Sequence, residues 1–169
     1  MKESTQRKIF DEWLANYRAL LFKVIRAYAT HREDQDDLFQ EICLQVYRSV
    51  PNFEEKSAVS TWIYRISLNT AIKWSTKEKK HLKGYNEPGK LDNVLEMNAK
   101  PVDDRIDWLY DEIQKFNEVD RSLSLLLLEG YSYKEMADLL GVSESNIGVK
   151  IHRIKKKLIE TSKHYDYGT

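Results

Sequence analysis

The pattern of apolar and polar positions in the first half of the chain predicts three helices. Apolar residues recur there at intervals of three and four, the spacing that places them on one face of an α-helix. We expect helices over residues 6–29 and 35–49, and a third that begins near Ser60 and runs out in the charged stretch KEKK. Pro51 ends the second helix because proline cannot continue it, and residues 52–57 form a loop.

The second half of the chain shows the same helical spacing after a stretch rich in helix breakers. Residues 81–101 hold two glycines and two prolines among polar residues, which is typical of a flexible linker. Asp103 or Asp104 is a suitable N-cap for the next helix. A further helix over residues 119–129 is expected to stop at Gly130.

Residues 132–158 carry a more specific pattern, SYKEMADLLGVSESNIGVKIHRIKKKL. Ser132 followed by Glu135 predicts a capping box at the start of a short helix. Gly141 allows a sharp turn, and Ser143 can cap the helix that follows. The apolar residues of that helix that should face inward are Ile147, Ile151, Ile154 and Leu158. This combination predicts a helix-turn-helix.

These elements predict an all-α chain of two small helical domains joined by a flexible linker, with the helix-turn-helix in the C-terminal domain. We place the first domain at residues 1–80, the linker at 81–101 and the second domain at 102–169. No stretch shows the alternation of a strand, and no internal repeat is present.

The second helix of the predicted helix-turn-helix is basic. Residues 143–158 contain five basic residues and one acid. The residues expected on its outward face are Asn146, Lys150, His152 and Arg153, followed by Lys155 to Lys157. Polar side chains near the start of a helix and cations along its length fit a DNA major groove. The alternative is a helical hairpin whose solvated face happens to be basic.

The distribution of charge along the chain is more informative than the net charge. The chain has 27 basic and 27 acidic residues, a formal balance of zero. Residues 101–142 carry four basic and ten acidic residues, whereas residues 143–169 carry six basic and three acidic ones. Such asymmetry suggests one basic face for nucleic acid, although helical proteins also segregate charge without binding nucleic acid.

Several classes of protein are disfavoured. The single cysteine, Cys43, excludes an internal disulfide framework and a cysteine-based zinc cluster. No apolar run approaches the roughly 18 residues of a membrane span, and the N-terminus lacks an apolar signal core, so we expect a cytoplasmic protein. The four histidines lack metal spacing, and no phosphate loop or nucleophile elbow is present. We therefore expect no enzyme activity, no metal and no cofactor.

Two stretches of the first half resemble a known family. Asp37 to Glu41, with the sequence DLFQE, resembles the D-L-x-Q-E signature of region 2 of bacterial sigma factors. Residues 53–70, FEEKSAVSTWIYRISLNT, resemble the next part of that region, and the helix-turn-helix at 132–158 resembles sigma region 4. In this order the motifs are similar to those of a small sigma factor of the extracytoplasmic-function (ECF) type.

The resemblance implies that region 2 binds the clamp helices of the β′ subunit of RNA polymerase. Asp37, Gln40 and Glu41 would make this contact, and their spacing places them on one helix face. The alternative is that acids at a helix start only complement its dipole.

The resemblance also implies promoter contacts. The loop and third helix would bind the −10 element, where unstacked bases favour aromatic faces and polar pockets. The matching base-contact residues are Phe53, Ser57, Tyr64 and Asn69, with Arg65 and Lys73 on the phosphates. Trp62 is expected in the core because it shares a stripe with Ile66. The −35 element would be bound by Asn146, Lys150, His152, Arg153 and Lys155.

The chain departs from the family pattern in its recognition helix. Gly148 and Val149 occupy positions that are often polar or basic in the family. Gly148 costs about 1 kcal/mol of helix propensity relative to alanine, and we expect it to permit close approach to DNA. A −35 sequence different from that of other family members is the natural expectation.

The leading hypothesis is an alternative sigma factor that binds core RNA polymerase, recognises the −35 and −10 elements of promoter DNA and assists melting. The resemblance further implies an anti-sigma factor as partner, and we expect no direct membrane insertion. The alternative is a helix-turn-helix regulator that binds an operator independently of core polymerase, because the C-terminal helices also resemble response-regulator effector domains.

Overall fold

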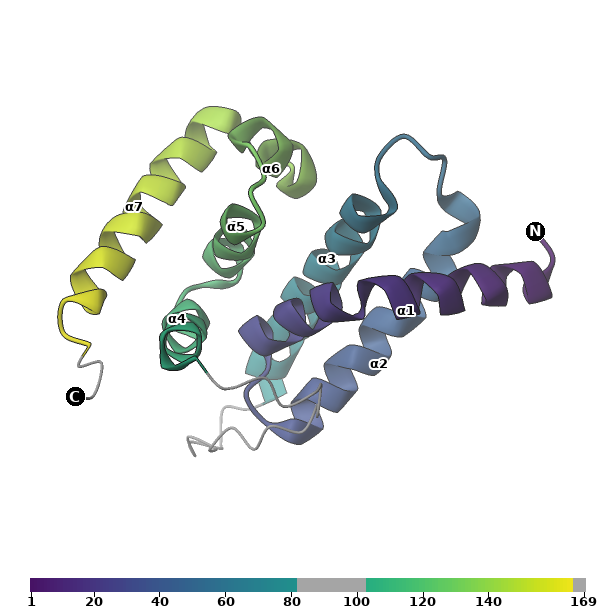
Figure 1. The fold of residues 1–169 in the computed structure, drawn as a ribbon, viewed down its shortest axis with the longest axis horizontal. Coiled ribbons are helices and arrows are strands. Elements are labelled where there is room, and N and C mark those ends of the chain that lie inside the picture. The colour runs from purple at the N-terminus through teal and green to yellow at the C-terminus, as the bar shows by residue number, and fades with distance from the viewer. Residues whose placement is uncertain (82–102, 166–169) are drawn as a thin grey trace. The chain divides into compact units, whose positions relative to one another are not determined.

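The computed structural model describes residues 1–81 and 103–165, and the chain divides into two compact units, Met1–Asn93 and Val94–Thr169. Over the described ranges it forms seven α-helices and one short 3-10 helix, with no strand (Figure 1). The all-α prediction is therefore confirmed. Apart from its first residue, the predicted linker at 81–101 lies outside the described residues. None of the described helices is long and apolar enough to cross a membrane.

Three helices and a short turn build the N-terminal unit. They are α1 (Glu3–Tyr28), α2 (Arg32–Ser49), the 3-10 turn η1 (Val50–Asn52) and α3 (Val59–His81). Each pair of the three helices is in contact, so the core lies where all three meet. Fully buried side chains come from each of them, including Leu21, Val24 and Ile25 of α1, Leu38 and Ile42 of α2, and Ile63, Leu68 and Ala71 of α3.

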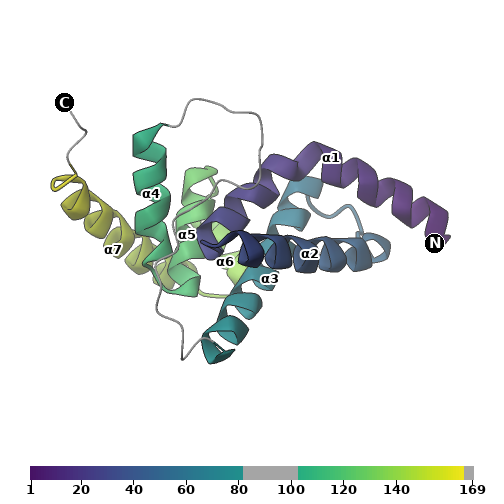
Figure 2. The same ribbon diagram turned by 90° about the horizontal axis from the view of Figure 1, so that it is seen from below.

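Helix α1 is bent rather than straight. Tyr17 leaves helical geometry (φ −116°, ψ 16°), and the bend is visible in Figure 2. Before the bend, Gln6 donates a hydrogen bond to the carbonyl of Tyr47 (2.8 Å), and Phe10 packs edge-on against the Tyr47 ring. The buried residues of the second part begin at Leu21. The two parts of α1 therefore hold opposite ends of α2.

The start of α2 differs from the prediction. The helix begins at Arg32 rather than near residue 35, and its N-cap residue His31 makes no side-chain capping bond. Gln35 lies inside the helix and is buried, where its amide donates to the carbonyl of Ala29 (3.0 Å). This contact between α2 and the end of α1 anchors the helix start in place of an aspartate cap.

The C-terminal unit contains α4 (Asp104–Gln114), α5 (Glu118–Leu128), α6 (Tyr133–Leu140) and α7 (Glu144–Ser162). Side-chain oxygens cap all four helices at their N-termini, as polar residues do for unpaired backbone amides. The caps are Asp103, Asn117, Ser132 and Ser143, of which Asn117 had not been predicted.

The predicted helix-turn-helix is present as α6 and α7. The Ser132 hydroxyl accepts from the Glu135 amide (3.1 Å), and the Glu135 carboxylate accepts from the Ser132 amide (2.6 Å). Gly141 ends α6 in the left-handed conformation (φ 68°), which penalises residues with a Cβ. Ile147, Ile151 and Ile154 are buried on the inner face of α7, so the predicted inward stripe is confirmed for these three residues.

Candidate functional site

A groove of about 560 Å³ lies between α2 and α3 in the N-terminal unit. It brings together residues that were predicted for two different roles. Asp37 and Glu41, expected to contact polymerase, line it together with Asn69 and Lys73, expected to contact promoter DNA. The remaining lining residues are Gln45, Arg48, Ser49, Asn52, Ile66, Thr70, Trp74, Lys77 and Glu78.

Hydrogen bonds fix the two carboxylates of α2 that line the groove. The Trp74 indole N–H of α3 donates to Asp37 Oδ2 (2.9 Å), and the Gln45 amide donates to Glu41 Oε1 (2.9 Å). Asp37 and Gln40 are exposed, and Glu41 is half-buried. Asp37, Gln40 and Glu41 thus form a row of polar side chains on α2. The two carboxylates of this row are hydrogen-bond acceptors held in defined positions.

The exposed face of α2 also carries an apolar residue that sequence reasoning missed. Leu44 follows Gln40 by four residues and Asp37 by seven, so it lies on the same helix face. Its side chain is 42% exposed. This face of α2 therefore combines polar side chains with one exposed apolar side chain. Its spacing from Gln40 was the available signal.

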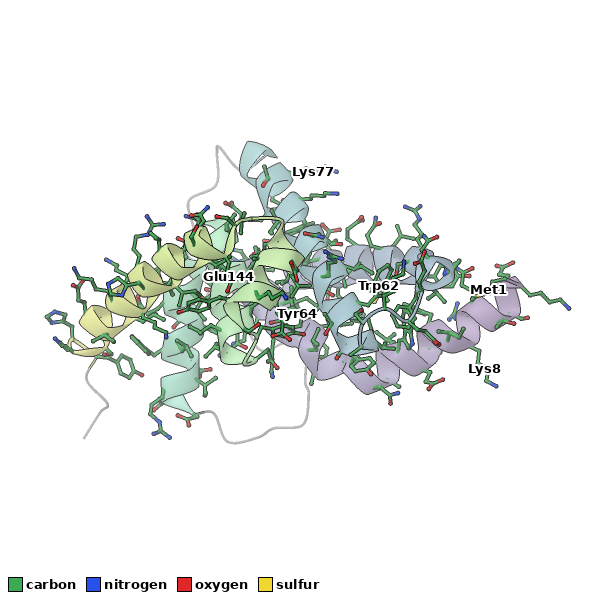
Figure 3. The ribbon with its side chains drawn as sticks, turned by 90° about the horizontal axis from the view of Figure 1, so that it is seen from above. Met1, Lys8, Trp62, Tyr64, Lys77 and Glu144 are labelled. Carbon is green, nitrogen blue, oxygen red and sulfur yellow. The ribbon has the colours of Figure 1, made fainter. Side chains whose placement is uncertain are left out.

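Exposed polar side chains form a row along α3. Arg65, Asn69 and Lys73 are each exposed and are spaced by four residues, which places them on one side of the helix. Lys77 continues the row towards the C-terminal end of α3 (Figure 3). The three cations of this row could bind DNA phosphates, and the amide of Asn69 could bind the edge of one base.

Tyr64 does not belong to this exposed row. Its side chain is 1% exposed and lies in the core, so the prediction that it contacts the −10 element is not supported. Trp62 of the same helix is half-buried, and its indole donates to the Ser49 hydroxyl (3.1 Å), in agreement with the expected packing role. Figure 3 labels both residues on α3.

The loop before α3 is anchored by aromatic packing. Phe53 is half-buried, with its ring 5.3 Å from Trp13 and 5.6 Å from Trp62 between centroids. Glu55 adopts the left-handed conformation (φ 56°) and turns the chain. Ser57 is exposed and donates to the carbonyl of Ala58 (3.3 Å). Phe53 therefore holds the base of the loop, and Ser57 stands in water.

The residues predicted for the −35 element fall into two groups. Asn146, His152, Arg153 and Lys155 are exposed on α7. Lys150 is not: its side chain is 23% exposed, and its ammonium lies 3.9 Å from Asp120 Oδ1 of α5. The expectation that Lys150 faces outward is therefore wrong in this structure, because a buried acid from a neighbouring helix attracts it. The outward position is taken by Val149, which is 66% exposed.

Gly148 was expected to permit close approach to DNA, but the nearest group to it in the structure is a side chain of the neighbouring helix. A Cβ built on this residue would meet the Tyr133 ring of α6 at 3.8 Å. The glycine therefore lies at the contact between α6 and α7, where it faces a tyrosine. That distance is an ordinary van der Waals contact, so the packing does not demand glycine.

Two side chains have shifted pKa values. Burial raises the pKa of the Cys43 thiol from 9.0 to about 11, and the charge of Arg18 opposes only part of this shift. Hydrogen bonds from Arg105 hold the pKa of Asp103 below its ordinary value. Neither group belongs to the surfaces described above, so both act in the structure rather than in recognition.

Comparison with known families follows the two units. Residues 13–81 match the family Sigma-70 region 2, and residues 107–158 match Sigma-70, region 4. The two matches cover well over half of the chain and occur in the order that the motifs predicted.

Characterised relatives extend over nearly the whole chain. The ECF RNA polymerase sigma-E factor of Haemophilus influenzae is 24% identical over 164 residues, which cover 90% of this chain and 86% of the relative. The ECF RNA polymerase sigma factor SigM of Mycobacterium tuberculosis is 26% identical over 163 residues, covering 90% and 76%.

Solved structures support the fold. The sigma factor RpoE of Bartonella quintana, in complex with the anti-sigma factor NepR, matches with a TM-score of 0.71 and 17% identity, covering 92% of this chain and 98% of that chain. CnrH, in complex with the cytosolic domain of CnrY, matches with a TM-score of 0.65 and 17% identity, covering 97% and 94%.

The two matched regions, one in each unit, define the chain as a transcription initiation factor. The chain belongs to the sigma-70 family, as an ECF-type sigma factor of RNA polymerase. It is thus an alternative sigma factor that directs transcription, and the reading as an independent operator-binding regulator is not favoured.

Proposed function

We propose that this sigma factor binds core RNA polymerase through the exposed face of α2 and binds promoter DNA through α3 and α7. The row of Asp37, Gln40 and Glu41 carries the first part of the proposal. Its carboxylates and amide lie within two turns of one helix, and two of the three are held by hydrogen bonds. A basic helix of the β′ clamp is the expected partner, with Leu44 at the C-terminal end of the row.

The DNA contacts are divided between the two units. On α3, the exposed Asn69 would offer a donor and an acceptor to a −10 base, and the exposed Arg65 and Lys73 would bind phosphates. On α7, the exposed Asn146 and Arg153 would contact the −35 element. The acidic surplus of residues 101–142 opposes tight DNA binding by the free chain, which favours promoter use only within the holoenzyme.

Transcription from fragmented genomic DNA by bacterial core polymerase, with mapping of RNA 5′ ends, tests the function. New 5′ ends that share two upstream sequence blocks at fixed spacing are expected only when this chain is added. Neither new ends nor binding to core polymerase would reject the proposal and favour the operator-binding regulator.

The contact on α2 has its own test. Combined Gln40→Ala and Glu41→Ala substitutions should abolish promoter-directed transcription, and Leu44→Ser should weaken core binding. Glu12→Ala is the matched control because Glu12 is an exposed acid on a different helix, α1. Full activity of the double variant would remove α2 from the polymerase contact.

An anti-sigma partner is part of the proposal. The two solved structures named above were both determined as complexes, one of them with a named anti-sigma factor. The exposed acidic row with Leu44 on α2 is a surface that such a partner would cover in competition with polymerase. A candidate partner should displace core polymerase from the wild-type chain. The Leu44→Ser variant should bind that partner more weakly and should no longer be displaced by it.

A further inference from the structure

Val149 stands at the centre of the outward face of α7. It follows the buried Ile147 by two residues and precedes the buried Ile151 by two, so it lies about half a helical turn from each. Its side chain is 66% exposed, and among the large apolar residues that the structure describes only Met1 is more exposed. The helix begins at Glu144, which Figure 3 labels. Val149 follows five residues later and therefore lies in the second turn.

Folding does not explain a valine at this position. A residue that is two-thirds exposed adds little to the core, and a β-branched side chain inside an exposed stretch of helix is less favourable than alanine. The glycine before it lies beside the Tyr133 ring of α6, which a Cβ would meet at an ordinary contact distance of 3.8 Å. Val149 is turned mainly to solvent instead.

The surroundings of Val149 fit a DNA major groove. His152 and Arg153 follow it by three and four residues, Asn146 precedes it by three, and all three are exposed. Lys150, the next residue along the chain, is turned away from this face towards Asp120 at 3.9 Å. The valine is therefore an apolar side chain surrounded by polar and cationic ones. It lies in the N-terminal part of α7, the part of a recognition helix that contacts base edges.

We propose that Val149 is a specificity-determining residue that contacts the 5-methyl group of a thymine in the −35 element. The major groove offers one apolar group, the thymine methyl, and aliphatic side chains recognise it by contact rather than by hydrogen bonding. A valine between an asparagine and an arginine would thus read T at one position, while its neighbours hold the adjacent bases and phosphates. This inference rests on the proposed −35 recognition by α7.

The test uses holoenzyme assembled from core polymerase and the whole chain. Promoters selected from a pool randomised in the upstream block should require thymine at one position. Replacing that thymine by deoxyuridine removes only the methyl group and should lower open-complex formation about three- to fourfold, the effect of one buried methyl. Val149→Ala should show the same loss on the thymine promoter and no further loss with deoxyuridine. Alanine is the better helix former, so this variant is expected to fold.

Ile159→Ala is the matched control. Ile159 is another β-branched residue on α7, 58% exposed, but it lies ten residues further along the helix. The control should keep the full discrimination between thymine and deoxyuridine. Equal discrimination by the wild type and Val149→Ala, or no thymine preference at any −35 position, would overturn the inference while leaving promoter-directed transcription intact. Absence of promoter-directed transcription by the wild type would overturn the proposed function and this inference together.

Discussion

The indole N–H of Trp74 donates a hydrogen bond to Asp37 Oδ2 across the groove between α2 and α3, over a distance of 2.9 Å. This bond fixes the position of one carboxylate in the row that we assign to polymerase binding. It also joins the helix that carries that row to the helix that carries the row for DNA. Loss of this hydrogen bond should therefore lower the affinity for polymerase as well as the stability of the fold.

Trp74→Phe tests this relationship. The substitution keeps an aromatic ring and removes the donor, so it should lower stability by about 1 kcal/mol and weaken core binding less than Asp37→Ala does. Thermal unfolding and a fluorescence titration with core polymerase measure the two effects. Trp62→Phe, which removes the indole bond to Ser49 (3.1 Å) on the same helix, should leave core affinity unchanged. Equal affinities for all variants would mean that the Asp37 orientation is irrelevant to docking.

Two glycine substitutions should have opposite effects on the helix-turn-helix. Gly148→Ala should raise stability by up to about 1 kcal/mol because its Cβ has room beside Tyr133 and alanine favours helix. Gly141→Ala should lower stability by about 1 to 2 kcal/mol because φ there is 68°. Thermal unfolding of both variants checks the signs. A stabilised Gly148→Ala that no longer uses its promoters would restore the idea that this glycine serves DNA approach.

Lys150 and Arg153 should separate stability from DNA binding. Lys150→Met removes the cation beside the nearly buried Asp120, so we expect a loss of about 1 kcal/mol in stability and little change in the salt dependence of promoter binding. Arg153→Met should leave stability unchanged and reduce the slope of log affinity against log salt concentration by about 1. A reduced salt slope for Lys150→Met would show that the side chain leaves Asp120 for a phosphate.

The thiol of Cys43 should be protected in the folded chain. Because burial raises its pKa to about 11, the native thiolate fraction at pH 8 is about 100-fold below that of a thiol with the ordinary value of 9.0. Alkylation by iodoacetamide should be correspondingly slow and should accelerate in denaturant. A native rate equal to the denatured rate would contradict the burial.

The same shift predicts a pH dependence. The unfolded thiol ionises first as pH rises, so the stabilisation from Cys43 is complete below about pH 9 and is lost between pH 9 and 11. Comparison of denaturant unfolding with Cys43→Ala across this range isolates the contribution of Cys43 from those of lysines and tyrosines.

Local pattern was sufficient for elements whose determinants lie close together in sequence. The capping box, the turn at Gly141 and the inward stripe of α7 each depend on residues within about two helical turns, and each was predicted. The start of α2 was placed a few residues late because its anchor is a glutamine bond to α1, for which no capping signal exists.

The candidate site was harder to predict because long-range packing decides which side of a helix is covered. The family motif placed Tyr64 on DNA, but α1 and α2 pack against α3 and leave its ring 1% exposed. Lys150 was expected in solvent, but Asp120, thirty residues earlier, draws it inward. Arg153 and Asn69 are exposed as predicted.

The opening turns of α1, before the bend at Tyr17, make their own contacts with the end of α2 and with the loop that follows it. These turns lie largely before residue 13, where the family match begins. Gln6 and Phe10 contact Tyr47 of α2, and the Trp13 ring packs against Phe53 at the base of the loop before α3. They support the loop before α3, which we propose to contact the −10 element. Because Gln6 and Phe10 lie in these turns, a trimmed terminus should release the end of α2 and weaken the support of that loop, so an inactive preparation should first be checked for its leading residues.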